Sequence, residues 1–279
     1  MTIRLAAVIG NPVGHSLSPA IHNAAFAASG RVGEYVAIEC GEREVKSTVA
    51  SLRKEGMVGL SVTMPLKESV IESLDSLHVT ASLLNAVNCV SFADGRVVGY
   101  NTDGDGCCDA LEQQGGANLQ GSTAVVLGAG GTARSVALSL GLRGANVRIV
   151  NRSEDRAEHL VNSLHFALAD SGGSLSVGSP SDIGAAHVLV NATSVGMNSH
   201  AMPVDASVLH KRLVVLDAVY SPMETALLTA ARAVEATTVD GLWMLIQQAR
   251  HQQVLWFGEN PDAQVMRLAA EQELERRRK

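Results

Sequence analysis

Short apolar stretches alternate with segments of helical spacing along most of the chain. In the first hundred residues, apolar runs predict strands at residues 5–9, 35–39, 58–63, 86–92 and 97–100. Helical spacing over residues 42–54 predicts a helix that stops at Gly56, because glycine readily adopts the conformation that follows a helix. Pro65 predicts the start of another helix, since proline suits the first turn.

The alternation becomes stricter after Asp103. Strands are expected at residues 123–127, 147–150, 188–190 and 213–216, and helices at 103–114, 132–142, 154–164, 242–257 and from 261 onwards. Continuous apolar runs such as 188–190 are typical of parallel strands that are buried on both faces. Strands that alternate with helices in this way predict an α/β fold with a parallel, doubly wound sheet in the second part of the chain.

Composition narrows the class of protein. The chain has 279 residues, enough for two domains, and is 46% hydrophobic and 18% charged, which excludes disorder. A formal charge of −6 and 3% aromatic residues do not suit a nucleic-acid partner. The four cysteines form no C-x-x-C pair, so we expect a reduced, cytoplasmic chain without a metal site. A signal peptide is not expected, because the first apolar stretch breaks at Gly10. A membrane span is not expected, because no apolar run approaches the ~18 residues that it requires.

A glycine-rich turn joins the expected strand 123–127 to the expected helix that follows it. Its residues are Gly128, Ala129, Gly130, Gly131, Thr132 and Ala133, which match the pattern G-x-G-x-x-(G/A). Small residues allow the tight turn, the approach of a pyrophosphate to the backbone, and close packing of helix on sheet. The turn therefore predicts a Rossmann-type dinucleotide-binding domain, whereas a tight turn without a ligand is the alternative.

The end of the next strand indicates which dinucleotide is bound. An NAD-binding domain carries an acidic residue at this point, but this chain has Asn151, Arg152 and Ser153, followed by Arg156. Guanidinium groups pair with phosphate, so these residues favour the 2′-phosphate of NADP. The alternative is that both arginines are solvated and pair with Glu154 or Asp155.

The first hundred residues carry further polar candidates. Ser16 and Ser18 precede an expected helix and could hold a carboxylate together with helix N–H groups, although Ser18 alone could serve as an ordinary helix cap. Lys67, Asn88 and Asp103 are also candidates, but each in isolation reads as an ordinary surface residue.

Taken in order along the whole chain, these segments resemble the shikimate dehydrogenase family. The segments that carry the resemblance are Ser16-Leu17-Ser18-Pro19, Val62-Thr63-Met64-Pro65-Leu66-Lys67, Asn101-Thr102-Asp103-Gly104, Gly128 to Ala133, Asn151-Arg152-Ser153, Asn191-Ala192-Thr193-Ser194-Val195-Gly196-Met197, Asp217-x-x-Tyr220-x-Pro222, Gly241 and Met244-Leu245-x-x-Gln248-Ala249.

The resemblance implies an organisation and a set of roles. Residues 1–102 and 240–279 would form an α/β substrate domain and residues 103–239 the Rossmann-type NADP-binding domain, with the active cleft between them. The expected reaction is the reversible, NADP-dependent reduction of 3-dehydroshikimate to shikimate, in aromatic amino-acid biosynthesis. By resemblance, Lys67 and Asp103 would be catalytic. Ser16, Ser18 and Tyr220 would bind the carboxylate, Thr63, Lys67, Asn88, Asp103 and Gln248 the ring hydroxyls, and Thr193, Val219, Gly241 and Met244 the cofactor.

Three positions depart from the family pattern. Ser61 stands where the family has asparagine, Asn85 where it has glycine and Cys89 where it has threonine. Ser61 is expected to reach a ring hydroxyl through water or to leave that contact to Thr63 and Lys67. Because of these departures, quinate or an amino analogue is an alternative substrate. A catalytically silent NADP-binding regulator is a further alternative, and the chain is expected to be a monomer or a homodimer.

Overall fold

The computed structural model describes residues 3–278, in which the chain forms two compact units. Unit 1 contains the chain up to Thr102 and again from Gln248, and unit 2 contains Asp103–Gln247. The chain leaves unit 1 at the expected residue. It returns at 248 rather than at the expected 240, because the return point lies inside the continuous helix α8 (Gly241–Phe257), whose first residues pack with unit 2.

Unit 1 is built on a six-stranded mixed sheet with the strand order β2-β1-β3-β5-β6-β4. Its strands are β1 (Arg4–Gly10), β2 (Glu34–Glu39), β3 (Gly59–Val62), β4 (Ser76–Leu77), β5 (Cys89–Ser91) and β6 (Val98–Tyr100). Strand β1 is parallel to β2 and β3, whereas β5 is antiparallel to both of its neighbours. The helices are α1 (Ser18–Ala28), α2 (Val45–Lys54), α3 (Val79–Leu84), α9 (Ala263–Arg278) and the second part of α8.

Alternation along β3 divides the two faces of this sheet. Leu60 and Val62 belong to a core that also contains Val49 of α2. The opposite face packs Tyr35 and Trp256 into a second core, where the indole N–H of Trp256 donates to the carbonyl of Val90 at 2.9 Å. Because successive side chains of a strand point to opposite faces, Ser61 faces this second core and α8.

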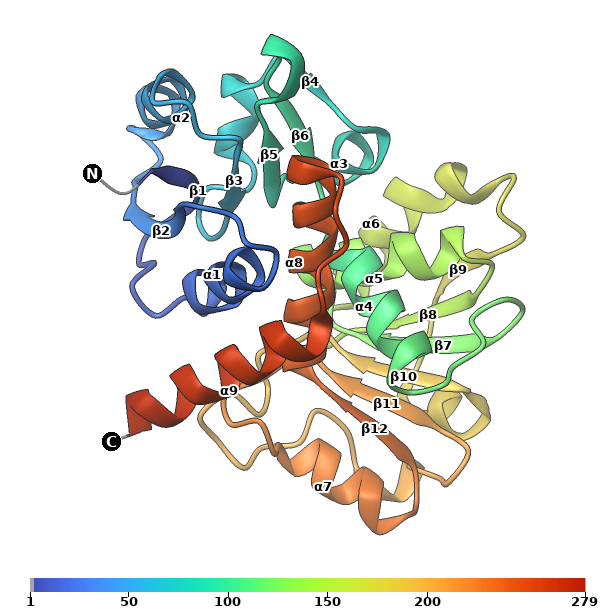
Figure 1. The fold of residues 1–279 in the computed structure, drawn as a ribbon. Helices are drawn as coiled ribbons and strands as arrows, with labels where there is room; N and C mark the ends of the chain where they lie inside the picture. Colours follow the sequence, from blue (N-terminus) through green and yellow to red (C-terminus); the bar gives the residue numbers. More distant parts are fainter. Residues whose placement is uncertain (1–2, 279) are drawn as a thin grey trace. The chain divides into compact units, whose positions relative to one another are not determined.

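Unit 2 is a doubly wound, fully parallel sheet with the order β12-β11-β10-β7-β8-β9. Its strands are β7 (Thr123–Leu127), β8 (Asn146–Val150), β9 (Ser174–Val177), β10 (Val188–Asn191), β11 (Val214–Asp217) and β12 (Thr237–Asp240). Its helices are α4 (Asp103–Gln113), α5 (Gly131–Leu142), α6 (Glu154–Leu164) and α7 (Ala226–Ala233), followed by the first part of α8. Helices α4 and α5 lie together on one face and α7 lies on the other (Figure 1).

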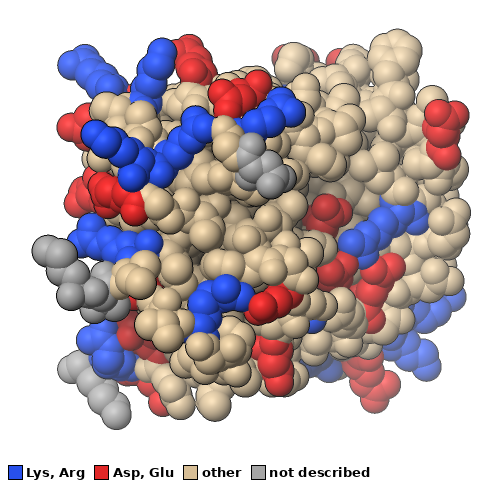
Figure 2. Space-filling view, turned by 45° about the horizontal axis from the view of Figure 1, so that its top comes forward, with Lys and Arg blue, Asp and Glu red and all other residues tan. Residues whose placement is uncertain are grey.

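The strand order of unit 2 places its loops. The order reverses direction between β7 and β10, so the loops that follow these two strands diverge at the carboxyl edge of the sheet. Ligands of open α/β sheets bind at such a point. The face drawn in Figure 2 carries lysine and arginine interspersed with aspartate and glutamate, and large areas of it carry no charge.

Several elements differ from the sequence-based expectation, among them β4, α3 and α7, at which no element was expected. Pro65 begins a turn and a short 3-10 helix (Ser69–Ser73) rather than an α-helix, because residues 65–68 form turns. Strands β9 and β12 were not expected, since their sequences Ser-Leu-Ser-Val and Thr-Thr-Val-Asp lack an apolar run. Both lie at the edges of the sheet, where a strand is less enclosed by apolar neighbours.

Candidate functional site

A cleft of about 700 Å³ opens at the carboxyl edge of the unit 2 sheet. Seven residues that the sequence predicts to bind a cofactor line it: Gly128, Ala129, Gly130, Asn151, Arg152, Arg156 and Thr193. These residues follow β7, β8 and β10, so three separate loops converge on one space.

The glycine turn leaves backbone exposed to this cleft. Gly128 has a φ of +111°, a conformation that side chains rarely adopt, and its N–H donates to the carbonyl of Val150 at 2.8 Å. A Cβ at Gly130 or Gly131 would meet no atom within 4 Å, so the space above the start of α5 is open. Thr132 follows in the first turn of α5, and Ala133 is fully buried. The N-terminus of α5 therefore fits a pyrophosphate, which backbone N–H groups can hold.

The other end of the cleft carries positive charge. Arg152 and Arg156 are exposed and line the cleft, while Asn151 donates from Nδ2 to the carbonyl of Ser153 at 2.9 Å and so shapes the turn before α6. Within residues 3–278, no ion pair joins either arginine to Glu154 or Asp155. The two guanidinium groups are thus available to a phosphate.

A buried aspartate supports the loops beyond the strands. Asp217, at the end of β11, accepts from Asn191 Nδ2 at 2.8 Å, from the hydroxyl of Thr225 at 2.7 Å and from the N–H of Val219 at 3.1 Å. Asn191 in turn accepts from the hydroxyl of Thr193 at 2.7 Å. Burial raises the pKa of the Asp217 carboxyl above its ordinary value. Asp217 therefore orders both Thr193 and Val219.

The remaining candidates of unit 2 lie in three places: Gly241 and Met244 in α8, Tyr220 in the loop after β11, and Asp103 at the start of α4. Gly241 begins α8, and a Cβ there would lie 2.6 Å from the carbonyl oxygen of Ala218, so only glycine allows this approach. Met244 is buried and Tyr220 is half-buried. Asp103 is the first residue of α4 and is partly buried.

In unit 1, the loop before α1 holds its two serines differently. The hydroxyl of Ser16 accepts from the N–H of Ser18 at 3.2 Å, whereas Ser18 is the first residue of α1 and its side chain does not cap the helix. The helix-cap explanation for Ser18 is therefore wrong. Its side chain is buried, at 8% exposure, and hydrogen-bonds with Tyr35.

Thr63 and Lys67 are held through their backbones. The N–H of Thr63, just after β3, donates to the carbonyl of Ile9 at 3.0 Å. The carbonyl of Lys67 accepts from the N–H of Val87 at 2.8 Å, next to Asn88 in the chain. Both side chains are partly buried. The structure thus brings the segment of Lys67 alongside the segment of Asn88.

A buried polar network lies between β3, β5 and α8, and we call it the glutamine network. Its members are Tyr35, Ser61, Asn88, Thr102, Gln248 and Gln252. Gln248 and Gln252 lie one turn apart on α8, and Nε2 of Gln252 donates to Oε1 of Gln248 at 2.8 Å. Three residues that the sequence predicts to bind substrate, Ser61, Asn88 and Gln248, are therefore joined.

Backbone groups fix the orientation of the Gln252 and Asn88 amides. A carbonyl can only accept, so the atom of Gln252 that lies 3.2 Å from the carbonyl of Asn88 is Nε2. Oε1 of Gln252 then accepts from the hydroxyl of Ser61, and Ser61 accepts from the hydroxyl of Tyr35 at 2.6 Å. A backbone N–H can only donate, so the N–H of Thr102 lies 2.8 Å from Oδ1 of Asn88, and Nδ2 of Asn88 points to Gln248.

Two consequences follow for the predicted residues. Oε1 of Gln248 accepts from both Gln252 and Asn88, so the other end of that amide is a donor. Ser61 uses its one hydroxyl hydrogen on Gln252 and is only 6% exposed. Ser61 is therefore linked to Gln248 through Gln252.

Sequence reasoning missed Thr102, Gln252, Asn191 and Asp217 as supporting residues. Thr102, Asn191 and Asp217 stand inside segments that were recognised, so their positions were visible although their roles were not. Gln252 had one signal, its spacing of four residues from Gln248, which places both on one face of a helix.

A doubly wound sheet with this glycine turn defines the class of dinucleotide-binding proteins. Three family models match the chain: the shikimate dehydrogenase substrate-binding domain over residues 8–90, shikimate/quinate 5-dehydrogenase over 110–195, and the shikimate 5′-dehydrogenase C-terminal domain over 241–271. The chain belongs to the shikimate dehydrogenase family, as its sequence segments predicted.

Individual relatives agree with this assignment. A shikimate dehydrogenase (NADP⁺) from Haloarcula marismortui is 45% identical over 262 residues, which cover 94% of this chain and 95% of the relative. A shikimate dehydrogenase crystallised with NADP⁺ has a TM-score of 0.89 and 35% identity, covering 97% of this chain and 95% of its own. The enzyme from Thermus thermophilus, solved with NADP(H) and shikimate, has a TM-score of 0.86 and 35% identity, covering 96% of this chain and 99% of its own.

Between residues 3 and 278, no helix has both the length and the apolar character needed to cross a membrane. In the same part of the chain, no three histidine, cysteine, aspartate or glutamate side chains gather in a way that could hold a metal ion.

Proposed function

We propose that this protein is an NADP-dependent dehydrogenase that interconverts 3-dehydroshikimate and shikimate, in the biosynthesis of aromatic amino acids. The observation that carries the proposal is the glutamine network, because it joins two amides expected to bind ring hydroxyls, Asn88 and Gln248, in one buried and directed array. Membership of the family and the nucleotide cleft of unit 2 support it. The free, buried cysteines fit a reducing compartment such as the cytoplasm.

Unit 1 takes the substrate in this proposal. The hydroxyls of Ser16 and Ser18, with Tyr220 of unit 2, bind the carboxylate. Thr63, Lys67, Asn88, Asp103 and Gln248 bind the ring hydroxyls. The donor end of Gln248 recognises a ring oxygen as an acceptor, because its carbonyl end is occupied by Gln252 and Asn88. Ser61 and Tyr35 act indirectly, by holding Gln252.

Unit 2 takes the cofactor. Backbone N–H groups from Gly128 to Thr132 hold the pyrophosphate, and Arg152 and Arg156 hold the 2′-phosphate, with Asn151 and Ser153 shaping that turn. Thr193, Val219, Gly241 and Met244 lie on the nicotinamide side. Asp217 orders Thr193 and Val219, as its hydrogen bonds indicate.

Lys67 and Asp103 move the proton. The nicotinamide cofactor, when bound, would supply the hydride acceptor for C3 of shikimate. Lys67 accepts the proton of the C3 hydroxyl in this direction and returns it in the other, and its ammonium stabilises the alkoxide that develops. Asp103 orients the same hydroxyl and holds Lys67 for the transfer. The products are 3-dehydroshikimate, NADPH and a proton.

The substrate and cofactor are tested together by steady-state kinetics. The purified protein should oxidise shikimate with NADP⁺, and kcat/KM for shikimate should exceed that for quinate or an amino analogue. It should also exceed the value with NAD⁺ in place of NADP⁺. A clearly higher kcat/KM for quinate or the amino analogue would overturn the choice of substrate, and NADP⁺ binding without turnover of any of them would favour a silent regulator.

Loss of Lys67 should slow proton transfer and leave cofactor binding intact. We expect Lys67→Ala to lower kcat by ~10²–10⁴-fold, the range for a lost acid–base group. The KM for NADP⁺ should stay within about twofold, because Lys67 belongs to unit 1. Lys54→Ala, on the exposed end of α2, is the matched control and should behave as the wild type. Near-normal turnover in Lys67→Ala would remove Lys67 from the mechanism.

Loss of Arg152 should affect one cofactor only. Arg152→Ala should weaken NADP⁺ binding by ~1.5–3 kcal/mol through the lost charge-assisted contact, and should hardly change NAD⁺ binding. Titration calorimetry with both cofactors measures the difference. Arg212→Ala, an exposed arginine of unit 2 outside the cleft, is the control. Equal weakening of both cofactors would show that Arg152 supports the fold and does not bind the phosphate.

A further inference from the structure

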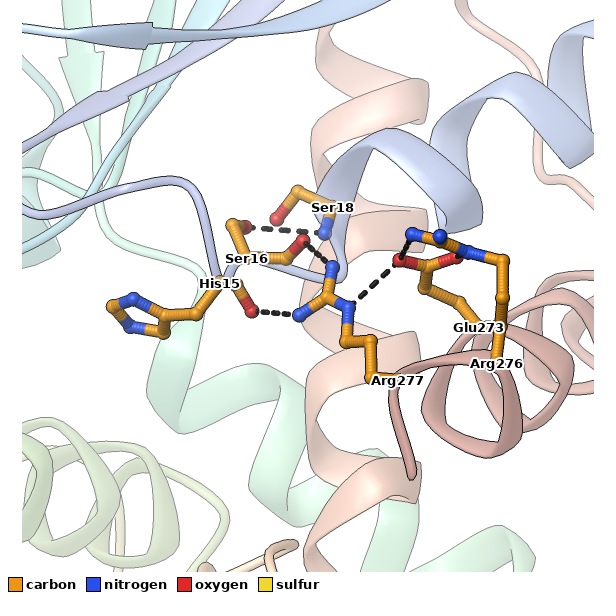
Figure 3. Close-up of polar contacts among 6 residues, drawn as sticks. All are labelled: His15, Ser16, Ser18, Glu273, Arg276 and Arg277. Carbon is orange, nitrogen blue, oxygen red and sulfur yellow. Dashed lines mark hydrogen bonds and ion pairs between the residues drawn. The ribbon is translucent and has the colours of Figure 1, made fainter. Parts of the chain in front are cut away.

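The last helix of the chain reaches back to the loop of Ser16 and Ser18 (Figure 3). Helix α9 packs on α1, and Arg277 near its end donates from Nη1 to the carbonyl of His15 and from Nη2 to the carbonyl of Ser16, the latter at 2.9 Å. One planar guanidinium thus holds two consecutive carbonyls across more than 260 residues of sequence. From sequence alone, the cations at this end are explained by the dipole of the helix without any partner.

Arg277 is itself held in place. Its Nε donates to Oε1 of Glu273, one turn earlier, at 2.7 Å, and Arg276 binds both oxygens of the same carboxylate. These hydrogen bonds from Arg276 and Arg277 lower the pKa of Glu273 to about 2. Glu273 therefore stays ionised throughout the pH range of an enzyme assay, and the guanidinium plane of Arg277 keeps its orientation.

With Arg277 in place, each backbone polar group of Ser16 has a defined partner. Its N–H donates to the carbonyl of Val13 at 2.9 Å, and its carbonyl accepts from Arg277. Its hydroxyl oxygen accepts from the N–H of Ser18 at 3.2 Å, so the hydroxyl hydrogen is directed away from that bond. Removal of Arg277 would leave the carbonyls of His15 and Ser16 without this support and would let the loop turn.

We propose that Arg277 is a positioning residue for the carboxylate end of the substrate. It acts through Ser16: the guanidinium holds the loop so that the hydroxyls of Ser16 and Ser18 keep the geometry that a planar carboxylate requires, and it adds positive charge beside that loop. The inference rests on the proposed function, since it takes Ser16 and Ser18 as the carboxylate site. The inference adds a residue of the C-terminal helix α9 to those that determine the binding of the substrate carboxylate.

The test compares an acid with its neutral ester. Arg277→Ala should raise the KM for shikimate by about 5- to 20-fold, the size expected for a lost charge-assisted pair of hydrogen bonds, and leave kcat within about twofold. The KM for shikimate methyl ester, which lacks the negative charge, should change by less than about twofold. Arg277→Lys should restore only part of the affinity, because an ammonium cannot span two carbonyls in a plane.

Arg276→Ala is the matched control. Arg276 shares the carboxylate of Glu273 but is 74% exposed and does not contact the loop. We expect it to leave both KM values unchanged. An unchanged KM for shikimate in Arg277→Ala would overturn the inference. An equal rise in KM for shikimate and its ester would also overturn it, because such a rise indicates a general loss of structure.

One further variant separates this inference from the proposed function. Ser16→Ala should raise the KM for shikimate. If the wild type oxidises shikimate but Ser16→Ala has a normal KM, the carboxylate assignment fails and the role of Arg277 fails with it. If Ser16→Ala behaves as expected and Arg277→Ala is normal, only the role of Arg277 is overturned.

Discussion

A hydrogen bond of 3.1 Å between the hydroxyl of Thr102 and the carbonyl of Gln248 joins the two points at which the chain leaves and re-enters unit 1. The same two residues both bind Asn88. The residues expected to recognise the substrate ring therefore lie where two features restrict the position of the chain. One is the sheet of unit 1, and the other is the insertion of unit 2 between Thr102 and Gln248. A change in either connection would shift the amide of Gln248.

The two units prepare their sites by different means. In unit 2 the backbone shapes the cleft: Gly128 turns the chain, the start of α5 is open, and the buried Asp217 orders the neighbouring loops. In unit 1 side chains form the polar network, and the direction of its buried amides would be ambiguous without the backbone groups of Asn88 and Thr102. Buried polar groups of this kind are costly when a partner is missing, so the network specifies one arrangement.

Much of the fold could be predicted from the sequence, and the reason differs between elements. Strand β7 and helix α6 were predicted to the residue, because an unbroken apolar run and a clear helical period mark them. The edge strands β9 and β12 lack such runs, and the return into unit 1 lies inside α8, where no break in the pattern marks it. The candidate site residues were predicted through segments of known spacing. The direction of the bonds around Gln248, and the reach of Arg277 to Ser16, depend on pairs distant in sequence and leave no local pattern.

The central claim is that the glutamine network turns the amide of Gln248 so that it donates to the substrate. Neutron diffraction from a deuterated crystal with shikimate bound would locate the hydrogens directly. We expect deuterium on the hydroxyl of Ser61 directed at Oε1 of Gln252, deuterium on Nε2 of Gln252 directed at Oε1 of Gln248, and a deuteron of Gln248 Nε2 directed at a ring oxygen of shikimate. A Ser61 deuteron directed at Tyr35, or a Gln248 carbonyl facing the substrate, would contradict the account.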